Sequence, residues 1–149
     1  FCARLTTYFN KIIVVNDGST DNTGKIAREL GCLVIDLPFH EESYVGTPKL
    51  AERLNAGLKL ASKENPDYIL LVGADHPLPK NYIEFLIEQM ERDDKLVIAS
   101  GHIKGEPYVE THPRGSGRLI KASFWKQLNN MQYPICWGWR AGCVSKHYN

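Results

Sequence analysis

A run of β-branched residues meets a polar turn in the sequence KIIVVNDGSTD, residues 11–21. Residues 11–16 predict a buried strand, because continuous apolar runs are typical of strands that are covered on both faces. The turn ends in Thr20 and Asp21, either of which can cap a following helix. This stretch therefore predicts a strand that leads directly into a helix.

The same alternation continues along the chain to about residue 100. Further strands are predicted at residues 32–36, 68–72 and 95–99, and further helices begin near Pro48 and Pro79. Apolar strands that alternate with amphipathic helices predict an α/β fold with a mostly parallel, Rossmann-like sheet and helices on both faces. Ligands of such sheets bind at the carboxyl ends of the strands.

The second half of the sequence has a different character. Residues 101–117 are rich in turn-forming residues, residues 119–128 predict a short strand and a helix, and residues 133–139 form an aromatic segment, YPICWGW. We expect a single domain over residues 1–149. Residues 1–100 would be its nucleotide-handling half, and residues 101–149 its turn-rich, specificity-bearing half.

Composition excludes several classes of protein. The 149 residues carry 18 Lys and Arg against 17 Asp and Glu, a net charge of +1, which argues against a nucleic-acid partner. Four scattered cysteines favour a reducing compartment, and no apolar stretch approaches the ~20 residues needed to cross a bilayer. We expect a cytoplasmic protein, either free or peripheral at the membrane surface. Because the sequence starts with Phe1, we also expect a domain that is incomplete at its N-terminus.

Asp17 and Gly18 are the first candidate site residues, because they follow the first predicted strand. A carboxylate there can accept hydrogen bonds from a base or ribose, and Gly18 permits close approach of a ligand to the backbone. A plain turn with a capping Asp is the alternative. A calcium loop is excluded, because the sixth position is Asn22 instead of glycine and the closing position is Arg28 instead of glutamate.

Asp75 and His76 are the second candidates, because they follow the strand at residues 68–72. A carboxylate followed by an imidazole can hold a divalent ion such as manganese, and a simple turn is the alternative. His40 precedes two glutamates, a pattern that predicts a solvated loop without a role in the site.

In this order, the motifs resemble those of glycosyltransferase family 2, the nucleotide-sugar enzymes with the GT-A fold. The resemblance rests on NDGSTDNT at residues 16–23, RLNAG at 53–57, YILLVGAD at 68–75 and GRLIKASF at 117–124. It extends from about residue 11 to residue 130, and it implies a GT-A fold.

The resemblance implies that Asp17, with Gly18 and Ser19, holds the nucleoside of the donor. It places Lys49 and Arg53 near the segment that contacts the base and phosphates, although a solvated helix face also explains these two side chains.

The resemblance also implies a divalent metal, Mn²⁺ or Mg²⁺, which Asp75 would bind together with the donor's diphosphate. The first acid of the family's Asp-x-Asp motif is Gly73 here, and His76 is a plausible substitute ligand. The catalytic base remains unassigned, because Trp139 is followed by Arg140 where the family has an acid.

The function implied is transfer of a sugar from a nucleotide-diphospho-sugar to an acceptor hydroxyl, with inversion and with metal assistance. The acceptor would be a carbohydrate or a lipid-linked glycan, and the rings of Tyr133, Trp137 and Trp139 could stack on it. Packing at the sheet edge explains these rings equally well. The alternative function is a nucleotide-sugar-binding module without catalysis.

Overall fold

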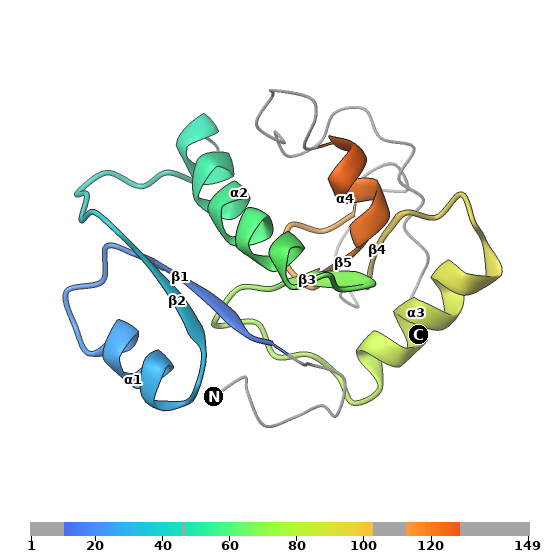
Figure 1. The fold of residues 1–149 in the computed structure, drawn as a ribbon, viewed down its shortest axis with the longest axis horizontal. Coiled ribbons are helices and arrows are strands. Elements are labelled where there is room, and N and C mark those ends of the chain that lie inside the picture. The colour runs from blue at the N-terminus through green and yellow to red at the C-terminus, as the bar shows by residue number, and fades with distance from the viewer. Residues whose placement is uncertain (1–10, 46, 103–112, 129–149) are drawn as a thin grey trace. The chain divides into compact units, whose positions relative to one another are not determined.

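A computed structural model of the chain describes residues 11–45, 47–102 and 113–128. Within these ranges the chain divides into two compact units, residues 11–65 and residues 66–128. Figure 1 shows the elements of both units.

The first unit contains a parallel pair of strands, β1 (Ile13–Asp17) and β2 (Leu33–Leu37). Parallel neighbours need a crossover connection, and α1 (Thr23–Glu29) provides it. Helix α2 (Pro48–Lys63) follows β2 (Figure 1). The predicted sequence of strand, helix, strand and helix is confirmed here.

Helix α1 begins close to the predicted point. Its N-cap residue is Asn22, and the neighbouring Asp21 carboxylate accepts a hydrogen bond of 2.9 Å from the backbone N–H of Thr23. A hydrogen bond from the Thr23 side chain and, after it, this backbone contact lower the pKa of Asp21. The helix ends before Gly31, whose φ of 81° is the left-handed conformation that glycine adopts readily.

The contact of α1 with the strands depends on its small residues. Gly24 and Ala27 are buried, whereas the larger apolar residues Ile26 and Leu30 are 51% and 58% exposed. A Cβ atom on Gly24 would lie 2.8 Å from Asn16 Nδ2, so the helix approaches the end of β1 closely.

Helix α2 starts with Pro48 at its first turn, as predicted, and packs against β1. Its buried residues are Ala51 and Leu58. At Gly57 an added Cβ would lie 2.8 Å from Val15 Cγ2, so this helix also approaches its strand closely.

The second unit contains a three-stranded sheet in the order β3 (Tyr68–Leu71), β5 (Arg118–Lys121) and β4 (Ile98–Ser100). Strand β5 is antiparallel to both neighbours, and its Ile120 pairs with Ile69 on β3 and with Ile98 on β4. Strands β3 and β4 therefore run in the same direction. The predicted α/β class is confirmed, but the central antiparallel strand is a finding that hydrophobic periodicity could not supply, because periodicity carries no information on strand order.

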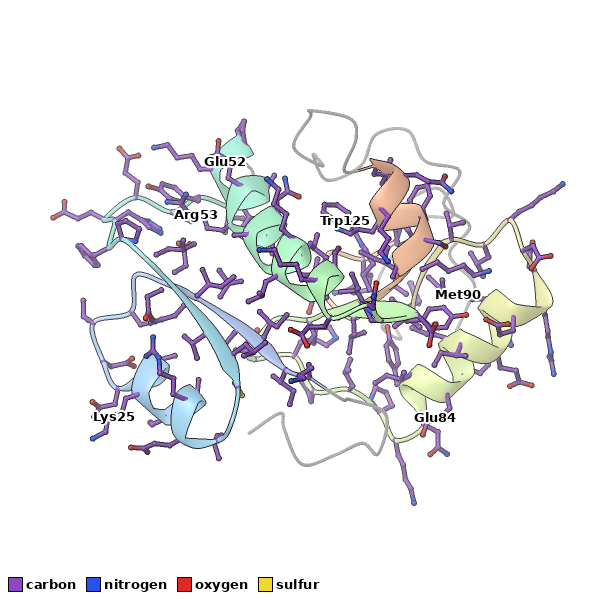
Figure 2. The ribbon with its side chains drawn as sticks, viewed as in Figure 1. Lys25, Glu52, Arg53, Glu84, Met90 and Trp125 are labelled. Atoms are coloured by element: carbon purple, nitrogen blue, oxygen red, sulfur yellow. The ribbon has the colours of Figure 1, made fainter. Side chains whose placement is uncertain are left out.

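Two helices cover this sheet's apolar residues. Helix α3 (Tyr82–Arg92) contributes Ile83, Leu86 and Met90 to the core, and α4 (Ala122–Leu128) contributes Trp125 (Figure 2). Their buried partners include Leu96, Ala99 and Leu119.

Tyr82 joins the ends of two strands. Its hydroxyl donates a hydrogen bond of 2.5 Å to the carbonyl oxygen of Gly117 and accepts one of 2.7 Å from the N–H of Gly101. A Cβ atom on Gly101 would lie 2.7 Å from the Tyr82 ring, and one on Gly117 would lie 2.9 Å from its hydroxyl. The two glycines therefore make room for this contact.

The segment before β5 is held by polar contacts. The buried Arg118 donates hydrogen bonds to the carbonyl oxygens of Arg114, at 2.9 Å, and Pro113, at 3.0 Å. Ser100 Oγ accepts a hydrogen bond of 2.8 Å from the N–H of Arg114. Among the described helices, none is long and apolar enough to cross a bilayer.

Candidate functional site

Asp17, the predicted nucleoside-binding residue, is the last residue of β1. Its Oδ1 lies 3.2 Å from Arg53 Nε on α2, and its Oδ2 lies 3.1 Å from His40 Nε2 in the segment after β2. The side chain is 31% exposed, so the carboxylate is held in place yet still accessible to a ligand. The structure thus brings together Asp17 and Arg53, two residues that the sequence assigns to the same site.

Gly18 allows the segment after β1 to pass close to the segment after β2. Its φ is 77°, and a Cβ atom there would lie 2.6 Å from the Cα of Phe39. Any other residue would force the two segments apart. Ser19 is exposed in the same turn.

Tyr44 connects the remaining cations to this site. Its ring stacks on the His40 ring, with centroids 3.7 Å apart and planes inclined by 13°. Lys49 Nζ lies 4.7 Å and Arg53 Cζ lies 4.9 Å from the centroid of the Tyr44 ring, which is within the range of cation–π interactions. Figure 2 shows Arg53 near the start of α2. The predicted pair Lys49 and Arg53 therefore shares one aromatic partner.

His40 corrects a sequence-based prediction, because its side chain is only 20% exposed. Its Nδ1 lies 2.6 Å from the carbonyl oxygen of Glu42, and a carbonyl can only accept, so Nδ1 carries a proton. Its Nε2 is at ion-pair distance from Asp17 but is not aligned for a hydrogen bond with it. The imidazole is thus oriented by Glu42, Tyr44 and Asp17.

His40 and Tyr44 were missed as site residues, although a signal for them exists. They follow β2, the parallel neighbour of β1, and the carboxyl ends of parallel neighbours meet at one edge of a sheet. That rule, applied to both strands instead of one, would have pointed to this segment.

A second set of polar contacts joins the ends of β1 and β2. Asn16 pairs with Asp36 across the two strands, and the Asn16 amide donates a hydrogen bond of 2.8 Å to Asp36 Oδ1. Arg28 on α1 donates to the other carboxylate oxygen. These two contacts lower the pKa of Asp36, with the hydrogen bond from Asn16 as the larger cause.

In the second unit, Asp75 and His76 lie in a turn after β3. The N–H of His76 donates to the carbonyl oxygen of Gly73 at 3.1 Å. Asp75 is exposed, and its carboxylate has no hydrogen-bond or ion-pair partner within the described part of the chain. The carboxylate is therefore available to a ligand.

Ser116 lies beside this turn, and its position was not predicted. Its Oγ accepts a hydrogen bond of 2.8 Å from the N–H of Gly73. A Cβ atom on Gly73 would stand 3.0 Å from Asp75 Oδ1 and 3.5 Å from Ser116 Oγ. No spacing in the sequence signals this contact, because it depends on β5 pairing with β3.

These oxygens fit one kind of divalent metal site. Across residues 11–45, 47–102 and 113–128, no three His, Cys, Asp or Glu side chains gather to enclose an ion. Magnesium, however, is commonly bound through one or two carboxylates, with substrate phosphates and water completing its coordination. The exposed Asp75 carboxylate suits an ion that arrives with a diphosphate.

The predicted acceptor-binding residues Tyr133, Trp137 and Trp139 lie outside the described residues. Asp17 belongs to the first unit and Asp75 to the second. The two candidate parts of the donor site therefore belong to different units.

Comparisons with known proteins agree with the motifs. Residues 2–147 match the family described as Glycosyl transferase family 2. Poly-beta-1,6-N-acetyl-D-glucosamine synthase of Staphylococcus aureus (strain COL) is 29% identical over 113 residues, which cover 73% of this chain and 24% of that protein. Glycosyltransferase GlyG of Streptococcus pneumoniae serotype 4 (strain ATCC BAA-334 / TIGR4) is 34% identical over 100 residues, which cover 64% of this chain and 31% of that protein. The chain thus spans about a quarter to a third of the length of these curated relatives.

Proposed function

The chain belongs to glycosyl transferase family 2, and on this premise we propose that it binds a nucleotide-diphospho-sugar and transfers the sugar to an acceptor hydroxyl. The observation that carries the proposal is the contact between Asp17 and Arg53. It joins a strand-end carboxylate to a helix cation, and the resemblance to the family implies donor binding for both residues.

The nucleoside would be held in the first unit. Asp17 offers carboxylate lone pairs to N–H or O–H groups of a base or ribose, and Arg53 and His40 keep it oriented. Lys49 and Arg53 are the cations of this site, and each is paired with a carboxylate: Lys49 Nζ lies 3.8 Å from Glu42 Oε2, and Arg53 Nε lies 3.2 Å from Asp17 Oδ1. Binding costs less when such groups are already positioned.

The diphosphate would be held in the second unit, with Asp75 and His76 as candidate ligands for Mn²⁺ or Mg²⁺. When bound, the metal would neutralise the charge that develops on the departing nucleoside diphosphate. Asp75 suits this role because its carboxylate is exposed and has no protein partner among the residues described.

The acceptor side of the proposal rests on the family. Inversion at the anomeric carbon, a carbohydrate or lipid-linked acceptor, and stacking by Tyr133, Trp137 and Trp139 belong to it. The division of one GT-A-like domain at residue 100 also remains a proposal, as does a cytoplasmic location, free or at the membrane surface. Because one relative is named as an N-acetyl-D-glucosamine polymer synthase, N-acetylhexosamine donors are the first to test.

The test is thermal unfolding of the whole protein with the 5′-diphosphates of uridine, guanosine, cytidine, adenosine and thymidine, each with and without Mn²⁺. A ligand at 100 times its Kd stabilises by about 2.7 kcal/mol. We expect one base to give a shift that is lost in Asp17→Asn and Asp75→Asn. The control is Asp94→Asn, which changes an exposed carboxylate elsewhere in the second unit. No shift with any diphosphate would reject the proposal.

A binding module without catalysis is the second candidate, favoured by Gly73 at the position where the family has an acid. The two are separated by incubating the bound nucleotide-sugar with glycan acceptors and with water alone. Release of the nucleoside diphosphate supports the transferase. Binding without release supports the module.

A further inference from the structure

We propose that Ser116 is a ligand-binding residue, whose hydroxyl donates a hydrogen bond to a diphosphate oxygen of the donor beside Asp75. The inference deepens the proposed function and rests on it. It assigns a role to Ser116, which lies in the segment before β5 and which no sequence motif singles out.

The hydrogen bonding of Ser116 leaves its proton available. Ser116 Oγ accepts a hydrogen bond of 2.8 Å from the N–H of Gly73, which fixes the position of the oxygen. A hydroxyl also carries one donor proton. Within the described ranges this proton has no acceptor, so it can be donated to a ligand.

Gly73 lies close to both the Ser116 hydroxyl and the Asp75 carboxylate. The position that a Cβ atom would take on Gly73 is 3.5 Å from Ser116 Oγ and 3.0 Å from Asp75 Oδ1. A side chain at position 73 would crowd both oxygens. Glycine therefore lets the hydroxyl and the carboxylate approach the same stretch of backbone after β3.

The two oxygens have complementary chemistry toward a diphosphate. The Asp75 carboxylate is anionic and accepts only, so it can approach a phosphate only through a bridging cation. The Ser116 hydroxyl is neutral and can donate directly to a phosphate oxygen. Hydrogen bonds to a charged partner are stronger than those between neutral groups.

The backbone on both sides of Ser116 is anchored, so the hydroxyl is positioned before a ligand arrives. Arg118 holds the carbonyl oxygens of Pro113 and Arg114, and Tyr82 holds that of Gly117. A positioned donor loses little conformational entropy when it binds.

The test compares Ser116→Ala with Ser100→Ala in the whole protein. Ser100 is a matched control, because its Oγ also accepts a 2.8 Å hydrogen bond from a backbone N–H, that of Arg114. The probes are the tightest-binding of the five nucleoside diphosphates and its nucleoside monophosphate. Both are measured by titration calorimetry with Mn²⁺.

We expect Ser116→Ala to weaken binding of the diphosphate about 10-fold or more, the loss typical of a hydrogen bond to a charged group. The monophosphate should change less than about twofold, Ser100→Ala should affect neither probe, and Ser116→Thr, which keeps a hydroxyl, should restore most of the affinity.

Three results would overturn the inference: unchanged diphosphate binding by Ser116→Ala, equal losses for both probes, or equal losses in Ser116→Ala and Ser100→Ala. The last would mean that the hydroxyl only braces the backbone. If the wild type binds no diphosphate, the proposed function itself fails. If it binds normally while Ser116→Ala behaves like the wild type, only the role of Ser116 fails.

Discussion

Replacement of Tyr82 by phenylalanine tests how strongly one hydroxyl holds the second unit together. The ring is 6% exposed, and its hydroxyl satisfies both the N–H of Gly101 and the carbonyl of Gly117. Phenylalanine keeps the ring volume, so no large cavity forms, but both buried backbone groups lose this partner. A buried group left without a partner costs about 1–3 kcal/mol. Because two such groups lose their partner, we expect a loss of about 2–6 kcal/mol in the free energy of unfolding.

Urea unfolding measures this loss as a decrease in the midpoint at constant slope. Hydrogen exchange of the Gly101 amide gives a local measurement, and we expect its protection to fall by a similar free energy. Tyr68→Phe is the matched control, because the Tyr68 hydroxyl donates to the exposed Glu91 carboxylate. Tyr68→Phe should change the free energy of unfolding by no more than about 0.5 kcal/mol. A Tyr82→Phe protein as stable as the control variant would refute the reasoning.

Three further outcomes are expected. Arg53→Lys should weaken nucleotide binding about tenfold, as measured by calorimetry. A lysine cannot keep both the Nε–H contact with Asp17 and the flat guanidinium over the Tyr44 ring. Unchanged affinity would contradict the proposed site. The hydrogen bond from Asn16 holds the pKa of Asp36 below its usual value of 3.8, so this carboxylate stabilises the fold fully above that pH and loses the effect as the pH falls through the lowered pKa. In Asp36→Asn the urea midpoint should therefore fall less steeply as the pH is lowered. An equally steep fall in the variant and the wild type would contradict this. Gly57→Val should lower the free energy of unfolding in urea by about 1–3 kcal/mol, because the added Cβ would lie 2.8 Å from Val15 Cγ2. An unchanged free energy of unfolding would show that α2 can move away from β1.

Much of the fold could be predicted from the sequence, because its signals are local. The β-branched runs located four strands, and Pro48 marked the first turn of α2. The position of β5 between β3 and β4 could not be predicted in this way. It depends on which strands pair across long stretches of chain, and hydrophobic periodicity does not contain that information.

In the candidate site too, residues with a local signal in the sequence were predicted, and residues that depend on contacts in space were not. Asp17 and Asp75 were found because Asp17 ends one apolar strand and Asp75 lies in the turn after another, and strand ends are where ligands of such sheets bind. Ser116 was missed because its relevance comes only from lying beside Gly73 in space. His40 was judged by its acidic neighbours in the sequence, whereas its ring packs on Tyr44 and faces Asp17.

The central place of β5 has a consequence for the order in which the protein can assemble during synthesis. Strands β1 and β2 are both complete once the ribosome has released Leu37, so their pairing can begin early. Strands β3 and β4 share no ladder with each other and must wait for residues 118–121. Until then their edges offer unpaired backbone groups to other chains. A nascent chain stopped before Arg118 would be unable to close this sheet and would be the form most in need of a chaperone.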